Sequence, residues 1–409
     1  MTAQELPNFH HLRAFSLTAH LRSVHGAARQ AHLSQPAVTQ AIGRLEKRFD
    51  CRFFERRSTG MYPTPLGEIM LLRVDRALDL LDGAARRIGE SARRNARARP
   101  APLDRMATTT QLRALIAISQ TGSFSAAARA IDQAQPSVHR AGRDLEKLAG
   151  VPLFERISHG VALTPHGRLL AMRASLAFKE IEAAGEDLEA AKGVVRGRLI
   201  IGTLPLVRTE LVPAALAGMT GAYPDAEISV IDGPYDGQLT ALRTGEIDML
   251  IGALREPAPA DDVEERALFF DTLSVIARRG HPLAGRTTIG IDDLRRYGWV
   301  VPRASTPTRE HFDALMRTGN EAPPPGLIVT SSLVVLRGLL LKSDRLAILS
   351  RRQVTYEERT GLLTALPVAL NDPPRPIGLT LRRNWHPTRL QSAFIAALED
   401  AVAREEQPI

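Results

Sequence analysis

The 409-residue sequence predicts two copies of a small helical domain, each ending in a hairpin and a long helix, followed by an α/β domain. Three observations support this. At a fixed offset of 100, residues 12–73 match residues 112–173 at 23 of 62 positions, which indicates a duplicated module. An apolar seam with heptad spacing follows each copy. From Gly197 onward, short apolar strands alternate with amphipathic helices, a pattern typical of a largely parallel sheet.

The first copy contains a helix-turn-helix pattern. A helix over 23–30 is separated by the turn His32-Leu33 from a second helix, which Ser34 caps and Pro36 begins. Apolar residues then recur at i, i+4 and i+7, which predicts one buried face: Val38, Ile42 and Leu45. The opposite face carries small, amide and basic side chains, the types that reach base edges and phosphates from the major groove: Gln35, Ala37, Thr39, Gln40, Arg44 and Lys47.

Residues 52–64 predict a hairpin wing after this helix. Gly60 lies in the middle of the segment and Arg56-Arg57 beside it. Such a basic hairpin suits contact with the DNA backbone or minor groove. A generic three-helix bundle with a solvated polar face is the alternative at this point.

The second copy departs from the first where DNA reading would matter. Ala134 replaces the capping serine, and Gly142 replaces Ile42, which weakens the helix. We therefore leave open whether copy two reads bases. The candidate DNA contacts are Ser34, Gln35, Pro36, Ala37, Thr39, Gln40, Arg44, Arg56 and Arg57 in copy one, and Gln135, Ser137, His139, Arg140, Arg143 and Arg156 in copy two.

The charge pattern agrees with a nucleic-acid partner. The chain has 53 Lys+Arg and 45 Asp+Glu, a net charge of +8. Residues 1–100 hold 17 basic and 9 acidic residues, residues 101–195 hold 11 and 10, and the remainder holds 25 and 26. A basic first segment on a neutral body suits a polyanion, although charge alone also fits a solvated surface.

The repeated string resembles the winged helix-turn-helix of LysR-type transcriptional regulators. Its motifs in copy two are Ser123-Phe124-Ser125-Ala126-Ala127-Ala128, Gln135-Pro136-Ser137, Leu145-Glu146, Leu153-Phe154-Glu155-Arg156 and Leu163-Thr164-Pro165-His166-Gly167. In that family the long helix after the wing pairs antiparallel with the same helix of a second subunit. The resemblance implies a sequence-specific DNA-binding transcriptional regulator.

The long helices carry the same seam twice: Met70, Val74, Ala77, Leu78, Leu81, Ala84 and Ile88, then Leu170, Ala174, Ala177, Phe178, Ile181, Ala184 and Leu188. We predict that helices 66–94 and 166–192 pair within one chain. The residues between Arg94 and Leu103 reach about 30 Å when extended, enough to pass one helix end. The rival arrangement pairs each helix with its twin in another subunit.

The C-terminal half opens with Gly197-Arg198-Leu199-Ile200-Ile201-Gly202 and continues in the order of the family's effector domain. The predicted strands are 199–202, 227–231, 248–252, 272–277, 298–301, 327–329, 346–349 and 376–381. The resemblance implies a two-lobed α/β domain like a type 2 periplasmic binding protein, with two crossing strands. Residues 342–345 replace the family's Gly-x-Gly, so we expect the inner wall of the second lobe to differ from that of the family.

An effector would bind between such lobes, at strand ends and helix N-termini, where backbone donors favour anions. The resemblance implies a small carboxylate or a sugar-derived metabolite. Each segment also fits a plain helix cap. The candidate effector contacts are Thr203, Leu204 and Pro205, then Ser305 and Thr306, then Ser331 and Ser332.

We divide the chain as follows: winged domain 1 over 8–66, linker helix 67–94, basic linker 95–107, winged domain 2 over 108–166, linker helix 167–193 and effector domain 196–409. Lobe I covers about 196–270 and 373–409, and lobe II about 271–372.

Other function classes fit poorly. No nucleophile elbow, phosphate loop or His-Glu-x-x-His motif is present, so we expect no enzyme and no cofactor beyond the effector. The N-terminal histidines lack metal-ligand spacing, and the lone Cys51 excludes an intrachain disulfide. No signal peptide or membrane span is apparent, which predicts a cytoplasmic, nucleoid-associated protein. Expected partners are double-stranded DNA, the effector, other copies of the chain and RNA polymerase. A transport solute-binding protein and a non-specific architectural protein are the rivals.

Overall fold

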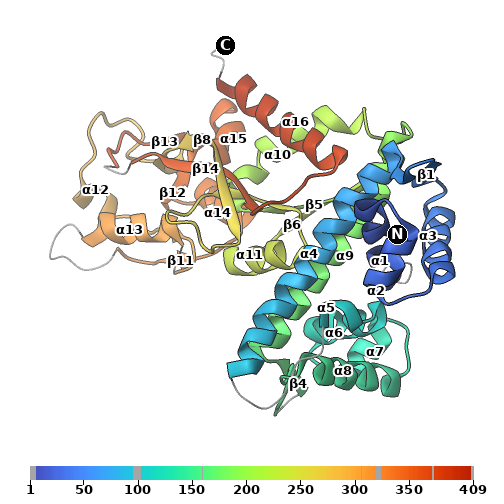
Figure 1. Cartoon of the computed structure of the whole chain (residues 1–409). Helices are drawn as coiled ribbons and strands as arrows, with labels where there is room; N and C mark the ends of the chain where they lie inside the picture. Colours follow the sequence, from blue (N-terminus) through green and yellow to red (C-terminus); the bar gives the residue numbers. More distant parts are fainter. Residues whose placement is uncertain are drawn as a thin grey trace.

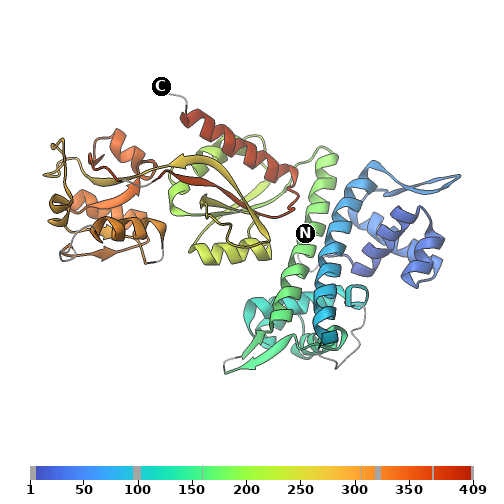
Figure 2. The same ribbon diagram turned by 60° about the vertical axis from the view of Figure 1, so that its left-hand side comes forward.

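The computed structural model of this chain describes residues 6–94, 103–158, 160–304, 306–317, 324–370 and 373–406. It contains two winged heads, a pair of long helices and a two-lobed domain (Figures 1 and 2). No helix in the described part of the chain is long and apolar enough to cross a membrane.

Head 1 folds as the predicted helix-turn-helix with a wing. Its elements are α1 (Phe9–Leu21), α2 (Val24–Ala31), α3 (Gln35–Phe49), β1 (Phe54–Arg57) and β2 (Gly60–Pro63). The side chain of Ser23 caps α2 and that of Ser34 caps α3. Gly60 has φ +142°, and a Cβ there would lie 2.4 Å from the carbonyl oxygen of Arg22. The tight approach of the wing to the end of α1 therefore requires this glycine.

Head 2 repeats the same order after the short helix α5 (Leu103–Met106). Its elements are α6 (Thr109–Thr121), α7 (Phe124–Ala130), α8 (Gln135–Ala149), β3 (Phe154–Ile157) and β4 (Gly160–Leu163). The wing approaches the end of α6 as in head 1, because the N–H of Val161 donates to the carbonyl oxygen of Gly122. The two copies predicted from the repeat are thus two equivalent domains.

The long helices α4 (Pro65–Arg94) and α9 (Pro165–Ala191) pack along each other within the chain, as predicted. All fourteen predicted seam residues are at most 7% exposed. The helices are antiparallel: Lys192, just after α9, donates to backbone oxygens of Phe49 and Asp50, next to where α4 begins. Both views show them side by side with a head near each end (Figures 1 and 2).

The two heads are related by an approximate two-fold axis. The backbone N–H of Phe9 donates to Oγ1 of Thr109, 3.2 Å away, and these two positions are equivalent in the two copies. Contact between equivalent positions is expected where a two-fold axis passes. Phe9 also stacks on Phe178 of α9, with ring centroids 5.6 Å apart. One chain therefore contains an internal pseudo-dimer.

Lobe I is a five-stranded sheet in the order β6-β5-β7-β14-β8. The strands are β5 (Gly197–Thr203), β6 (Ala226–Asp232), β7 (Met249–Ala253), β8 (Val263–Asp271) and β14 (Arg375–Arg382). Its helical segments are η2 (Pro205–Arg208), α10 (Leu211–Thr220), α11 (Tyr235–Thr244) and α16 (Arg389–Glu406). Leu199 and Ile201 pack with α10 and α16, whereas Ile200 packs with α11, so the sheet is covered on both faces.

Lobe II has a smaller core. Its strands are β9 (Leu273–Arg278), β10 (Val300–Val301), β11 (Ile328–Val329), β12 (Ala347–Ser350) and β13 (Leu363–Ala365). Its helical segments are α12 (Ile291–Arg295), α13 (Pro307–Arg317), α14 (Leu333–Lys342), η3 (Arg351–Val354) and α15 (Thr355–Arg359). A bridge between Trp299 and Leu346 connects the β10-β11 pair to the β12-β9-β13 sheet. Trp299 is completely buried against Phe312 of α13.

The expectation of a largely parallel sheet holds only in part. Strands β5, β6 and β7 are parallel, but β14 is antiparallel to both β7 and β8, and β9 is antiparallel to β12 and β13. The chain crosses from lobe I to lobe II at the end of β8 and returns through β14. The returning strand β14 therefore runs opposite to its neighbours β7 and β8. The sequence prediction also missed β8 and β13.

Candidate nucleic-acid interface and effector cleft

In head 1, the helix α3 presents the predicted DNA-contacting face to solvent. Val38, Ile42 and Leu45 are at most 5% exposed, which anchors the helix in the head. The predicted contacts on the opposite side are exposed, except for the half-buried Ala37. The side chain of Gln35 lies 2.5 Å from Nδ1 of His25, so α2 holds this amide at the start of the helix. The face thus combines an anchored backbone with accessible polar groups.

The wing of head 1 concentrates positive charge. Arg56 and Arg57 are exposed on β1, and the Arg57 guanidinium pairs with the Glu55 carboxylate. Arg22 and Arg57 both lie over the ring of Tyr62, 4.9 and 4.8 Å from its centroid. These cation–π contacts hold two guanidinium groups together at one edge of the head. They leave this edge suited to a phosphate backbone.

Head 2 also exposes its predicted contacts, but several are engaged locally. Arg143 donates to Glu146, 2.8 Å away, and His139 packs on the ring of Phe124 with centroids 5.0 Å apart. Ala134 provides no side-chain cap to α8, as the sequence predicted. Gln135, Ser137, Arg140 and Arg156 are exposed. The polar face is therefore present in head 2 with different chemistry.

Gly142 has a packing role that the sequence analysis missed. Its position is buried, and a Cβ there would lie 3.2 Å from ring atoms of both Phe124 and Phe154. In head 1 the equivalent of Phe124 is Val24, opposite the larger Ile42. The glycine thus compensates for a larger neighbour rather than merely weakening the helix.

We expect Gly142→Ile to destabilise the chain by about 1–3 kcal/mol, because the added side chain overpacks the two rings. The double variant Phe124→Val/Gly142→Ile copies the head 1 pair and should recover most of the loss. Urea unfolding of the wild type, both single variants and the double variant measures the coupling. Strictly additive losses would contradict this compensation.

The effector candidates in lobe I lie at the end of β5. Thr203 is completely buried, and its hydroxyl donates to the carbonyl oxygen of Ile231, 3.3 Å away. The N–H of Leu204 donates to the carbonyl oxygen of Ile251. Pro205 begins the four-residue 3-10 turn η2, so no α-helix follows β5 directly. The expected helix N-terminus at this strand end is therefore replaced by a tight turn.

The candidates in lobe II flank two helices. The hydroxyl of Thr306 accepts from the N–H of Arg309 at the start of α13, and Ser332 caps α14 by accepting from the N–H of Val335. Ser331 is exposed beside it. Ser305 lies outside the described residues. Lobe II thus has two helices whose first turns are capped by a hydroxyl group. The candidate segment of lobe I, residues 203–205, has no such helix start.

A polar cluster at the strand crossing was missed by the sequence analysis. The Asp271 carboxylate ends β8 and accepts from the Ser350 hydroxyl at 2.6 Å and from two nitrogens of Arg375 at 2.9 and 3.1 Å. Arg375 also donates to Thr308 of α13. Ser350 is completely buried. The cluster joins both crossing strands to lobe II. It could not be predicted because Asp271 ends β8, a strand that the sequence did not reveal.

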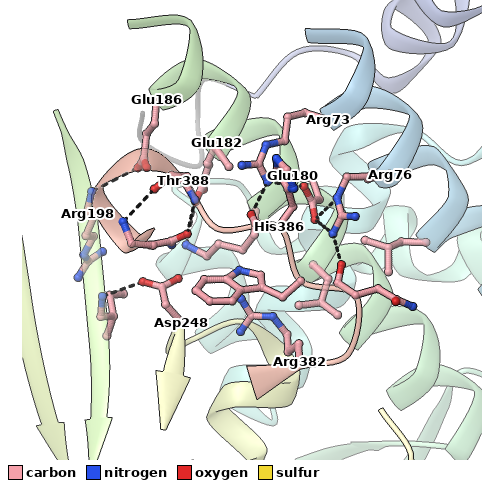
Figure 3. Close-up of a pocket in the computed structure, with 18 of the residues that line it drawn as sticks. Arg73, Arg76, Glu180, Glu182, Glu186, Arg198, Asp248, Arg382, His386 and Thr388 are labelled. Carbon is pink, nitrogen blue, oxygen red and sulfur yellow. Dashed lines mark hydrogen bonds and ion pairs between the residues drawn. The ribbon is translucent and has the colours of Figure 1, made fainter. Parts of the chain in front are cut away.

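A groove of about 2090 Å³ lies between the long helices and lobe I, and it too was not predicted (Figure 3). Arg73 of α4 is 1% exposed and donates to Glu180 at 2.9 Å, to Asp187 at 2.8 Å and to the backbone oxygen of His386 at 2.8 Å. Arg76 donates to Glu180 and to the backbone oxygen of Asn384. These charged bonds hold α4, α9 and lobe I together. The signal available in the sequence was a basic residue interrupting an apolar helix beside the seam.

Glu186 of α9 lines the same groove. Burial raises its pKa to about 7, and the like charges of Asp248, Asp187 and Glu182 act in the same direction. The backbone N–H of Arg198 donates to its carboxylate from the start of β5, which opposes the rise. This carboxyl group therefore titrates near neutral pH at the contact between α9 and lobe I.

The raised pKa predicts a stability change with pH. Between pH 4.5, the ordinary value, and about 7, the folded chain keeps a proton on Glu186 that the unfolded chain releases. Stability from this group is thus complete at acid pH and falls as the pH rises through 7. The wild type should therefore lose up to about 3 kcal/mol of unfolding free energy between pH 5 and pH 8 through this group. Glu186→Gln does not titrate at this position, so its stability relative to the wild type should rise by the same amount. Urea unfolding at both pH values measures the gain, with Glu68→Gln, at an exposed position of α4, as control. A constant difference between Glu186→Gln and the wild type would be inconsistent with this assignment.

Cys51 is half-buried, and burial raises the pKa of its thiol, although the Lys192 ammonium opposes this. Among the described residues, no three His, Cys, Asp or Glu side chains are grouped to hold a metal ion.

Two family models match the chain. One, described as the bacterial regulatory helix-turn-helix protein of the lysR family, matches residues 9–68 and again 109–168. The other, described as the LysR substrate binding domain, matches residues 192–403. Together they cover both heads and the two-lobed domain.

Curated relatives differ in how much of the chain they match. The HTH-type transcriptional regulator GalR of Pseudomonas putida is 34% identical over 401 residues, 98% of this chain and 99% of that protein. The HTH-type transcriptional regulator PcaQ of Agrobacterium fabrum is 26% identical over 293 residues, 71% of this chain and 93% of that protein. The GalR match therefore includes both heads, whereas the PcaQ match leaves more than a quarter of this chain uncovered.

Solved structures share the fold. ArgP from Mycobacterium tuberculosis aligns with a TM-score of 0.56 at 17% identity, covering 72% of this chain and 96% of that one. Full-length LysG from Corynebacterium glutamicum with bound effector Arg aligns with a TM-score of 0.53 at 18% identity, covering 72% and 97%.

Proposed function

This chain belongs to the LysR family of transcriptional regulators, and we propose that its two heads act together as one DNA-binding unit controlled by a small molecule between the lobes. The family consists of DNA-binding regulators with an effector-binding domain, not of enzymes. The observation that carries the proposal is the internal pseudo-dimer, in which one chain presents two exposed recognition helices. We assign no catalytic activity to this chain.

The DNA-contacting residues are those of the exposed faces of α3 and α8 and of the wings. Their exposure, and the burial of the opposite faces, support this role. The domain limits given above apply, with the strand crossing near Asp271 and Arg375 separating lobe I from lobe II. Other copies of the chain and RNA polymerase complete the set of proposed partners, and the chromosome in the cytoplasm is the proposed site of action.

The effector is a small carboxylate-bearing metabolite. The hydroxyl-capped starts of α13 and α14, at Thr306 and Ser332, support an anion in the cleft. Ser305, Ser331 and the segment Thr203-Leu204-Pro205 complete the proposed contacts. The Asp271–Arg375 pair lies on the two strands that cross between the lobes, so closure of the lobes would change its surroundings. The charged groove around Arg73 then transmits the change from lobe I to the long helices.

Gel shifts with the promoter DNA upstream of the chain's own gene and of its neighbours test the DNA-binding function. We expect at least one such duplex to bind about a thousandfold more tightly than a scrambled duplex of equal length and composition at matched salt. Comparable affinity for every duplex would instead support an architectural protein. Binding of small carboxylates without any DNA binding would support a solute-binding protein.

A thermal-shift screen with small carboxylates tests the effector site. A carboxylate that stabilises the wild type should stabilise a Ser332→Ala variant less, because the variant lacks one hydroxyl at the cleft. Lys342→Gln, at the far end of the same helix, serves as the control. Equal shifts in Ser332→Ala and the wild type would remove Ser332 from the site.

A further inference from the structure

The exposed faces of the two recognition helices differ at most positions, although three of their buried residues are identical. Val38, Ala41 and Leu45 have identical buried equivalents in Val138, Ala141 and Leu145. On the exposed side the initial Gln-Pro and one later lysine, Lys47 in head 1 and Lys147 in head 2, are kept. The positions that differ are Ala37 and Ser137, Thr39 and His139, Gln40 and Arg140, Gly43 and Arg143, and Arg44 and Asp144. The duplicated fold is preserved while the chemistry offered to DNA has changed.

These differences change what each helix can read. A glutamine such as Gln40 pairs with adenine in a bidentate manner, whereas an arginine such as Arg140 pairs with guanine. The exchange of Arg44 for Asp144 replaces a donor with an acceptor and reverses the charge. Asp144 lies 3.4 Å from Lys147 of the same helix. Two such helices therefore select different bases at equivalent positions.

Because α4 pairs with α9 of the same chain, each pair of long helices carries one head 1 and one head 2. Arg73 of α4 is buried against Glu180 and Asp187 of α9. The equivalents of these acids in α4 are Leu80 and Arg87. Pairing of α4 with its twin from another chain would therefore bury Arg73 opposite an apolar group and a like charge, which is costly. The sequence of α4 thus favours α9 as its partner.

From these observations we propose that each chain recognises a non-palindromic DNA site with two different half-sites, one for each head. This inference rests on the proposed DNA-binding function and specifies its target. At the position read by Gln40 in one half-site and Arg140 in the other, the first carries adenine and the second guanine. The asymmetric site also fixes which way the chain is oriented on the duplex.

Selection of binding sites from a random duplex library by the full chain tests the proposal. We expect a consensus of two unlike half-sites. Symmetric duplexes that carry either half-site twice should bind at least about tenfold more weakly, because two or more bases are then wrong for one head. A palindromic consensus, or one half-site with random flanks, would overturn the inference while leaving DNA binding intact. Enrichment of no sequence at all would contradict the proposed function itself.

A swap variant supplies the second readout. Ser137→Ala/His139→Thr/Arg140→Gln/Asp144→Arg gives α8 the head 1 residues at four exposed positions and raises the net charge by one. It should now prefer the symmetric duplex with two head 1 half-sites. Asp132→Asn makes the same charge change at an exposed turn with φ +51°, which asparagine tolerates, and should retain the asymmetric preference. Loss of the preference in both variants would contradict base reading by α8.

Discussion

Replacing Arg73 with alanine is expected to destabilise the chain by about 3–5 kcal/mol, because it removes a buried cation between the buried carboxylate of Glu180 and the half-buried carboxylate of Asp187. Glu180 would keep its contact with Arg76, and Asp187 would lose its bond from α4. The contact with the backbone oxygen of His386 would also be lost, which loosens lobe I from the helices. Denaturant unfolding followed by circular dichroism measures the loss.

The matched control for this prediction is Arg173→Ala. Arg173 occupies the equivalent position in α9 but is only half-buried, so its removal should cost less than about 1 kcal/mol. Similar losses for the two arginines would show that the groove network does not distinguish the two long helices.

Head 1 is expected to provide most of the DNA affinity. Residues 9–65 hold nine Lys+Arg and three Asp+Glu, whereas the matched window 109–165 holds six and four. The triple variant Arg44→Ala/Arg56→Ala/Arg57→Ala should weaken binding on the order of a hundredfold and lower the salt dependence by about three counterions. Titrations of a promoter duplex at several salt concentrations measure both.

The comparison variant removes Arg140, Arg143 and Arg156 of head 2. Its loss should be smaller, because residues 109–165 carry fewer basic and more acidic groups than residues 9–65. Equal losses at matched salt would mean that the two heads share the phosphate contacts evenly.

Most of the fold could be predicted from the sequence because the repeat, the helix caps and the apolar spacing all indicate the same elements. The repeat located both heads, the serine before Gln-Pro located the start of α3, and heptad spacing identified fourteen buried seam residues. Copy two lacks the capping serine and has Gly142 where copy one has Ile42, yet the same fold forms, and Phe124 and Phe154 occupy the space beside Gly142. That compensation involves residues distant in sequence, so no local pattern shows it.

The sites were predicted less completely, for a physical reason. The strand β8 reads Val-Glu-Glu-Arg-Ala-Leu-Phe-Phe-Asp, which lacks strict alternation because it pairs along its length with β14 across a bulge. The cluster around Asp271 was therefore invisible. The groove around Arg73 and Glu180 depends on how lobe I docks on the long helices, a contact between residues over 300 positions apart. Only the folded chain brings these groups together.

The central claim is that α4 and α9 of one chain pair with each other. It is tested most directly with Ala77→Cys/Ala177→Cys in a Cys51→Ser background, in which a mild oxidant joins neighbouring thiols as a disulfide at nanomolar protein concentration. Both alanines are completely buried at the seam. We predict crosslinks within single chains, at a yield independent of concentration, and no dimer from the Ala77→Cys single variant. Crosslinks that form only between chains and increase with concentration would contradict the account.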